Sequence, residues 1–203
     1  MNTKCACLLV AAMLFSNTAR ATLIDFDDGV AGDIIDGRYV DRGVRFANAV
    51  RVSNFGLNGF SGPYGISAIG AFQWLSDNPI VAYFSKAVTD VSFVGIDVGD
   101  NGLRLDAYDA EAGGNLIGFA QVFGENLGNN QFFMLAVNAK LIKRVEIFQI
   151  QQVSIDGIVI EDLRFSAVPL PASGLLMAIG LSGWRLLNRR SQQCLRIDTS
   201  LNA

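Results

Sequence analysis

The chain of 203 residues contains no histidine. Nucleophilic sites of the Ser-His-Asp and Cys-His types use an imidazole base, so both are excluded, and zinc loses its most common nitrogen ligand. The three cysteines, Cys5, Cys7 and Cys194, lie near the two ends of the chain. No disulfide is therefore expected in the central segment. That segment must be stabilised by its apolar core, with or without a bound metal.

Basic residues are scarce between Thr22 and Val168, where ten Lys and Arg face eighteen Asp and Glu, a net charge of −8. The whole chain has a net charge of −3, because its other basic residues collect near the two ends. A nucleic-acid-binding domain needs a basic surface for the phosphates, and this segment has no basic tract. We therefore expect no nucleic-acid partner, and instead a soluble, acidic surface that attracts cations.

The amino terminus has the pattern of a secretory signal peptide. Lys4 provides a positive start, residues 5–15 are apolar, and Ala19 and Ala21 fit the rule of small residues before a cleavage site. The apolar run is too short to span a bilayer as a helix. We expect signal peptidase to remove residues 1–21, so that the mature chain begins at Thr22.

Three features follow one another near the carboxyl end. The first is a hinge marked by prolines, which disfavour helix; it consists of Val168, Pro169, Leu170, Pro171 and Ala172. The second is an apolar run to Leu187, at the short end of the length that spans a membrane. The third is a basic cluster of the kind that marks the cytoplasmic side of a membrane; it consists of Arg185, Arg189 and Arg190.

In this order the hinge, apolar run and basic cluster resemble the PEP-CTERM sorting signals, in their VPLPA variant, which exosortases process. The resemblance implies a protein that is anchored in the inner membrane, cleaved near the hinge by an exosortase-type enzyme and released to the cell surface. Leu170 stands where the commoner form has Glu, and a polar tail, residues 191–203, follows the basic cluster. A plain single-pass anchor is one alternative, and a degenerate sortase signal at residues 170–174 is another.

Between the two signals the sequence is typical of an all-β domain. Val, Ile, Phe and Leu recur in short runs separated by Gly, Asn and Asp, without sustained helical periodicity. We expect an antiparallel, jelly-roll-like β-sandwich over residues 22–167. Residues 66–74 fit either a buried strand or an irregular segment. The expected strands are 22–26, 43–46, 50–55, 80–84, 89–98, 103–108, 116–122, 132–137, 142–150 and 157–165.

Short motifs in this segment resemble the β-sandwich domains that PEP-CTERM proteins often carry. The motifs are residues 24–28, 43–46, 105–109 and 160–165. The resemblance implies a non-enzymatic, structural or adhesive protein associated with exopolysaccharide. Jelly-roll carbohydrate-binding modules share the layout and often hold a structural calcium, so a carbohydrate-binding module is one alternative. A secreted glycan-active hydrolase is the other, although no pair of catalytic acids stands out from the sequence.

Five carboxylates are expected to converge if the first strand lies beside the last. They are Asp25, Asp27, Asp28, Glu161 and Asp162. Calcium takes about six to eight oxygen ligands, which carboxylates and turn carbonyls supply. The sequence therefore predicts a calcium site at this junction. The alternative is a set of solvated carboxylates that alternate with core residues along the strands.

Two further groups have weaker signals. The first is a possible ligand group near a turn, although turn chemistry alone explains its composition; it consists of Asp97, Asp100 and Asn101, with Asp106 and Asp109 beyond them. The second is a set of aromatic residues in and after a Gly-rich loop: Phe55, Phe60, Tyr64 and Trp74. Exposed rings of this kind stack on sugars, but core filling is the better supported interpretation.

Overall fold

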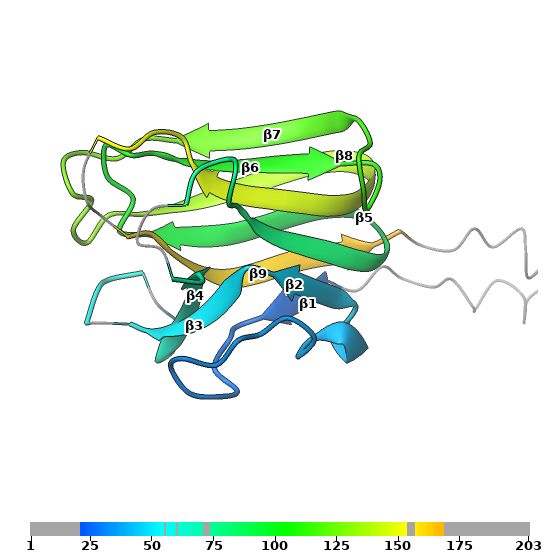
Figure 1. The fold of residues 1–203 in the computed structure, drawn as a ribbon. Helices are drawn as coiled ribbons and strands as arrows, with labels where there is room; N and C mark the ends of the chain where they lie inside the picture. The colour runs from blue at the N-terminus through cyan, green and yellow to red at the C-terminus, as the bar shows by residue number, and fades with distance from the viewer. Residues whose placement is uncertain (1–20, 55, 60, 71–73, 154–156, 169–203) are drawn as a thin grey trace, which may run out of the picture. The chain divides into compact units, whose positions relative to one another are not determined.

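A computed structural model describes residues 21–54, 56–59, 61–70, 74–153 and 157–168 (Figure 1). The described elements are β1 (Ala21–Ile24), the short 3-10 helix η1 (Val40–Arg42), β2 (Val44–Ala47), β3 (Ala49–Ser53), β4 (Tyr64–Ala68), β5 (Ile80–Ile96), β6 (Leu103–Tyr108), β7 (Leu116–Val122), β8 (Phe132–Gln149) and β9 (Val159–Ala167). Every pairing between these strands is antiparallel. The predicted all-β class is confirmed for this part of the chain.

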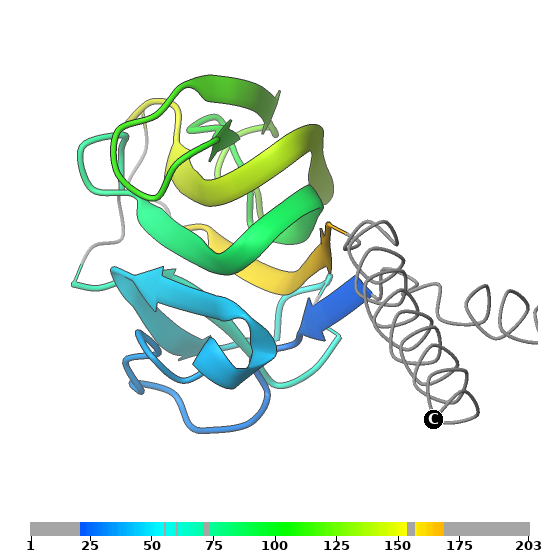
Figure 2. The same cartoon turned by 90° about the vertical axis from the view of Figure 1, so that its right-hand side faces the viewer.

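The long strands β5 and β8 pair with each other along both of their halves, and each bends in the middle. The first half of β5 and the second half of β8 form one part of the sheet with β2, β6 and β7. The second half of β5 lies between the first half of β8 and β9. Strand β9 carries β1 and β4, and β4 carries β3. The bend folds the sheet over so that its inner side chains enclose one core, as a β-sandwich does (Figure 2).

The bend in β5 replaces a turn that the sequence suggests at residues 85–87. Ser85, Lys86 and Ala87 have negative φ angles, whereas the tightest hairpin turns need positive ones. The chain therefore continues forward, and Val88 finds Ile142 as its partner in β8. The strands expected at residues 80–84 and 89–98 are one strand, and so are those expected at 132–137 and 142–150.

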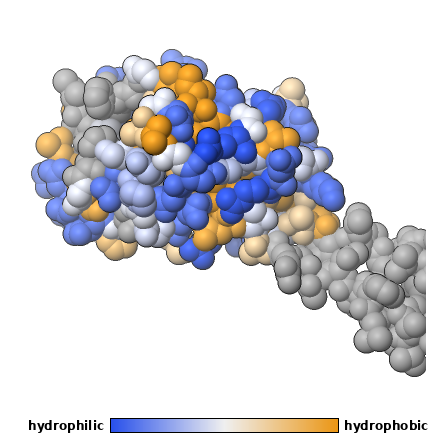
Figure 3. All heavy atoms as spheres, turned by 90° about the horizontal axis from the view of Figure 1, so that it is seen from below, coloured by the Kyte–Doolittle hydropathy of each residue, from blue (hydrophilic) through white to orange (hydrophobic). Residues whose placement is uncertain are grey.

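Aromatic side chains fill the core. Phe26, Tyr39 and Phe46 meet edge to face, with centroids 5.7 to 6.0 Å apart, a favourable geometry for ring pairs. Trp74 is fully buried, which confirms core filling for this residue. Phe55 and Phe60 lie outside the described residues. On the face in Figure 3, apolar patches are scattered among hydrophilic side chains.

The two ends of the described domain lie close together. Ala21 pairs with Ser166 in β9, and the Val168 amide donates a hydrogen bond to the Ala87 carbonyl, 3.1 Å away. The chain therefore enters and leaves at one end of the sandwich, beside the bend in β5 (Figure 1). Several predicted residues lie outside the described part of the chain: Ala19, Pro169, Leu170, Pro171, Ala172, Arg185, Arg189 and Arg190. Within the described residues, no helix has the length and apolar character needed to cross a membrane.

Candidate functional site

The first and last strands are neighbours, as the calcium prediction requires. Ile24 in β1 is directly opposite Leu163 in β9. Beyond β1 the chain turns and brings the Asp27 carboxylate near Asp162. Repulsion from the Asp162 charge contributes to the raised pKa of Asp27. Asp27, Glu161 and Asp162 therefore share one end of the strand pair, which we call the junction.

Glu161 is fully buried at the junction, where residues 61 and 62 donate hydrogen bonds to its carboxylate. The Ser61 amide donates to both carboxylate oxygens, at 2.7 and 2.8 Å, and the Ser61 hydroxyl and Gly62 amide donate to Oε1 at 3.0 and 3.1 Å. Burial raises the pKa of Glu161, and these donors partly oppose that shift by stabilising the charged form. Glu161 is thus held by hydrogen bonds and not left free.

Asp162 lies in a bulge of β9. The pairing of β9 with β5 shifts register between Ser92 and Val94, and Asp162 has a φ of 52°. A bulge redirects the side chain of the extra residue. Here it brings Asp162 Oδ1 within 3.1 Å of the Ser61 hydroxyl and Oδ2 within 2.9 Å of Arg164 Nη2.

Asp27 and Asp28 point in different directions. Asp27 Oδ1 accepts a hydrogen bond from the Tyr64 amide at 3.1 Å, next to the junction, and desolvation is the main cause of its raised pKa. Asp25 stays close, because its Oδ1 lies 3.4 Å from the Asp27 amide. Asp28 instead bonds Arg51 Nη2 at 2.7 Å. Four of the five predicted carboxylates are therefore near one another, and Asp28 is not one of them.

The donor set at the junction only partly suits calcium. Among the described residues, no group of three acidic side chains is arranged to hold a metal ion. The Glu161 oxygens already accept several N–H and O–H donors, and a cation has to displace some of these. The calcium site stays a prediction, and its candidate ligands at the junction are Asp27, Glu161 and Asp162.

A buried arginine explains the different position of Asp28. Arg51 is 1% exposed, and its Nε donates to the Phe26 carbonyl at 2.7 Å. Its two terminal nitrogens each lie 2.7 Å from a carboxylate, one from Asp28 and one from Asp33. Tyr39 donates to Asp28 at 2.7 Å, and burial with this bond raises the pKa of Tyr39 to about 12. This network fixes the segment between β1 and β2.

The group near Asp97 does not form one site. Asp100 Oδ1 accepts from the Asn126 amide at 2.9 Å, and Asn101 Oδ1 accepts from the Val153 amide at 2.9 Å. These bonds connect loops, as the turn interpretation predicts. Asp97 Oδ1 is buried without a hydrogen-bond partner, and burial raises the pKa of Asp97. Asp106 and Asp109 lie elsewhere: Asp106 is on the outer face of β6, and Asp109 accepts from Asn115 in the next hairpin.

A second surface, absent from the sequence-based prediction, crosses the outer face of β2, β5, β8 and β6. Directly opposite residues in adjacent strands form a row of four: Arg45, Tyr83, Arg144 and Tyr108. The guanidinium carbon of Arg45 lies 4.1 Å from the centroid of the Tyr83 ring, and that of Arg144 lies 4.2 Å from the Tyr108 ring. Cations and aromatic rings attract each other at these distances. We call this row the arginine–tyrosine ladder.

Acidic and polar residues lie next to the ladder. Glu146 and Asp106 are directly opposite each other on β8 and β6. Asp106 Oδ1 is 2.7 Å from Arg104 Nε, and the Arg104 guanidinium carbon is 4.3 Å from the centroid of the Phe119 ring. Burial, with the nearby Glu146 and Asp106 carboxylates, raises the pKa of Tyr108. The Arg144 Nε atom is 3.2 Å from Glu146, an ion pair without the alignment of a hydrogen bond.

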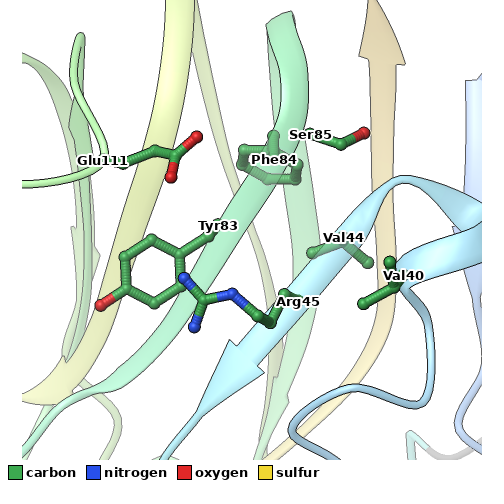
Figure 4. Close-up of a pocket in the computed structure, with 7 residues that line it drawn as sticks. All are labelled: Val40, Val44, Arg45, Tyr83, Phe84, Ser85 and Glu111. Atoms are coloured by element: carbon green, nitrogen blue, oxygen red, sulfur yellow. The ribbon is translucent and has the colours of Figure 1, made fainter.

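A pocket of about 150 Å³ adjoins the β2 end of the ladder (Figure 4). Arg45 and Tyr83 form one side, and Glu111 lies across from them in the view. The Glu111 carbonyl accepts a hydrogen bond from Arg144 Nη1 at 3.0 Å, which fixes this loop against the ladder. Val40, Val44, Phe84 and Ser85 complete the lining. Such a surface combines flat ring systems with side chains that donate and accept hydrogen bonds.

No model of a known protein family matches this chain, and no curated protein matches it. Several solved structures have similar folds. One is the K1 cleaved adhesin domain of Lys-gingipain from Porphyromonas gingivalis W83, with 8% identity, a TM-score of 0.48, and coverage of 73% of this chain and 99% of that one.

Two others contain carbohydrate-binding modules. The tandem CBM22 domain of Paenibacillus barcinonensis Xyn10C has 8% identity and a TM-score of 0.44, over 77% of this chain and 47% of that one. The CBM6 module of Cellvibrio mixtus lichenase 5A, in complex with cellotriose, has 7% identity and a TM-score of 0.35, over 68% of this chain and 99% of that one. These values describe a general likeness of fold.

Proposed function

We propose that this protein is an exported, non-enzymatic β-sandwich that binds polysaccharide at the cell surface or in the extracellular matrix. The observation that carries the proposal is the arginine–tyrosine ladder. Sugars are recognised by flat aromatic surfaces together with a few well-placed polar groups. Arg45, Tyr83, Arg144 and Tyr108 provide both in one row on the sheet.

Arg144, which is 9% exposed, is the most firmly held member of the ladder. Arg144 is held by the Tyr108 ring, the Glu146 carboxylate and the Glu111 carbonyl. A surface that is already ordered loses little side-chain entropy when it binds a ligand. Strands also position residues more accurately than loops do. These features support binding of an extended glycan across the strands.

A hydrolase is the weaker second candidate. Retaining and inverting glycosidases need two carboxyl groups, one of which is kept protonated as the general acid. Asp106 and Glu146 are the adjacent acids of the ladder face, and each has an arginine within 3.2 Å. Both carboxylates are therefore already engaged in ion pairs within the protein.

We also propose that the chain is processed at both ends. Signal peptidase removes residues 1–21, and an exosortase-type enzyme cleaves near the hinge after transient anchoring in the inner membrane. The adjacent positions of Ala21 and Val168 support this, since both processing sites connect to one end of the sandwich. Structural calcium at the junction is the remaining part of the proposal, with Asp27, Glu161 and Asp162 as ligands.

The test is affinity electrophoresis of the full chain in gels that contain individual polysaccharides, with reducing-sugar release measured in parallel. We expect retardation by at least one polysaccharide, no product release, and loss of retardation in Tyr108→Ala. The matched control is Phe132→Ala, an exposed ring opposite Ile96, at the far end of β5 and β8 from Tyr83 and Arg144. Lack of retardation by every polysaccharide contradicts the proposal, and release of reducing ends supports the hydrolase instead.

A further inference from the structure

Arg45 differs from the other arginines of the described segment. The side chains of Arg38, Arg51, Arg104, Arg144 and Arg164 all have ion pairs. Arg42 donates a hydrogen bond to the Leu23 carbonyl. Among the described residues, the Arg45 side chain has no carboxylate within 4.0 Å and makes no hydrogen bond; it lies over the Tyr83 ring. A segment of net charge −8 thus keeps an exposed arginine whose side chain has neither a counterion nor a hydrogen bond.

Arg45 is also well positioned to meet a ligand. Its guanidinium carbon is 4.1 Å from the Tyr83 centroid, so the cation is held at the pocket wall. Figure 4 shows the Glu111 carboxylate across the pocket. Arg45 and Glu111 form no ion pair. A ligand that fits between them meets a donor fork on one side and a hydrogen-bond acceptor on the other.

The charge around the pocket is less negative than elsewhere. Lys86, Lys140 and Lys143 are the lysines of the described segment, and all lie at the bends of β5 and β8, where Val88 faces Ile142. Lys86 and Arg42 line the adjacent pocket of about 320 Å³. Asp41 and Glu111 are the acidic residues that line the two pockets. An anionic ligand is therefore repelled least at this end of the domain.

We infer that the Arg45 pocket binds the carboxylate of an acidic sugar, a uronic acid within the polysaccharide of the proposed function, on which this inference rests. The guanidinium fork matches a carboxylate in two parallel hydrogen bonds. Glu111 accepts hydrogen bonds from sugar hydroxyls and repels a second anionic group. This combination favours one carboxylate on a polyol over the dense charge of a phospholipid surface.

The experiment is calorimetric titration of the full chain with oligogalacturonate and with the same oligosaccharide after its carboxyl groups are reduced to alcohols. We expect the acidic form to bind at least about tenfold tighter, from one charge-assisted pair. Arg45→Ala should remove this preference and leave the affinity for the reduced form unchanged. Arg45→Lys should restore only part of it, because an ammonium lacks the planar fork.

Lys140→Ala is the matched control, because it removes the same charge from an exposed site in the bend of β8. Equal weakening by Lys140→Ala and Arg45→Ala indicates diffuse attraction and overturns the inference. Equal or tighter binding of the reduced oligosaccharide also overturns it, while the proposed glycan binding stands. Binding of neither form, together with Arg45-dependent binding to phosphatidylglycerol vesicles, assigns the pocket to lipid and overturns it as well. If no polysaccharide retards the protein in the gels, the proposed function itself is contradicted.

Discussion

Arg51 Nη2 lies 2.7 Å from Asp28 Oδ1, and this pair joins a fully buried guanidinium to a carboxylate whose side chain is 47% exposed. The contact turns Asp28 away from the junction and anchors the chain between β1 and β2. Arg51 also bonds Asp33 and the Phe26 carbonyl. The buried cation is thus completely surrounded by acceptors, as burial of a charge requires.

The first prediction concerns this network. Arg51→Ala should lower the free energy of unfolding by about 3–5 kcal/mol, because it removes the central partner of a buried ionic cluster. Urea denaturation measures the change. Arg38→Ala is the control: Arg38 pairs with the same Asp28 from the surface, with its side chain 40% exposed. Its loss should cost no more than about 1 kcal/mol. Similar losses in both variants would show that Arg51 is not the centre of the network.

The second prediction is a pH dependence caused by Glu161. Burial raises the pKa of Glu161 above its ordinary value of 4.5. The folded state therefore binds this proton more tightly than the unfolded state, and the Glu161 contribution to stability falls as the pH rises above 4.5. Glu161→Gln removes that titration and keeps an acceptor at Oε1, so its unfolding free energy should fall less steeply above pH 4.5.

Denaturation at a series of pH values tests this difference. Asp27 also has a raised pKa, so the variant should keep a smaller slope of the same sign. Glu125→Gln, the same substitution at an exposed loop residue, is the control for the chemical change itself. A Glu161→Gln profile parallel to that of the wild type would refute the prediction.

The third prediction is stabilisation by calcium at the junction. Millimolar calcium should raise the melting temperature of the full chain by several degrees relative to a chelator, since a ligand specific for the folded state adds about 2.7 kcal/mol at a hundredfold excess over Kd. Magnesium should do less, because it requires a tight octahedron. Asp27→Asn with Asp162→Asn should abolish the response. Asp28→Asn should lower the melting temperature and retain the response, since Asp28 bonds Arg51. No calcium effect in the wild type would mean that the junction is held by hydrogen bonds alone.

The fourth prediction concerns processing. Protein recovered from the cell surface should begin at Thr22 and end within residues 168–173. Intact mass spectrometry tests both ends. Replacing Pro169 and Pro171 with Ala should keep the protein in the inner membrane. Without the prolines the recognition segment can form a helix, whereas cleavage requires an extended segment. A surface-recovered mass that includes residues 175–190 would favour a plain anchor over exosortase processing.

Much of the fold was predictable because strand alternation is a local property. In β6, Leu103 and Leu105 are buried while Arg104 and Tyr108 are half-buried, as their alternating order in the sequence indicates. The bend at residues 85–87 was harder to predict, because polar residues suit both a turn and an exposed bend. Only the partner strand β8 decides between the two.

The sites were less predictable, for two physical reasons. Asp27 and Asp28 are adjacent in sequence, but one side chain turns to the junction and the other to Arg51, whose burial depends on distant partners. The ladder forms only when four strands align in register, and Arg45 and Tyr108 alone give no local signal. Cross-strand pairs of this kind require the register of the whole sheet.

The most direct test of glycan binding by the ladder is nuclear magnetic resonance mapping of the labelled full chain. Spectra are recorded with and without a polysaccharide that retards it in the gel. The account predicts that the largest shifts occur at Arg45, Tyr83, Tyr108 and Arg144, with little change at Ser61 and Glu161 in the junction. Shifts that concentrate at the junction or in the loops around Asp100 and Asn126, with the ladder unchanged, would contradict it.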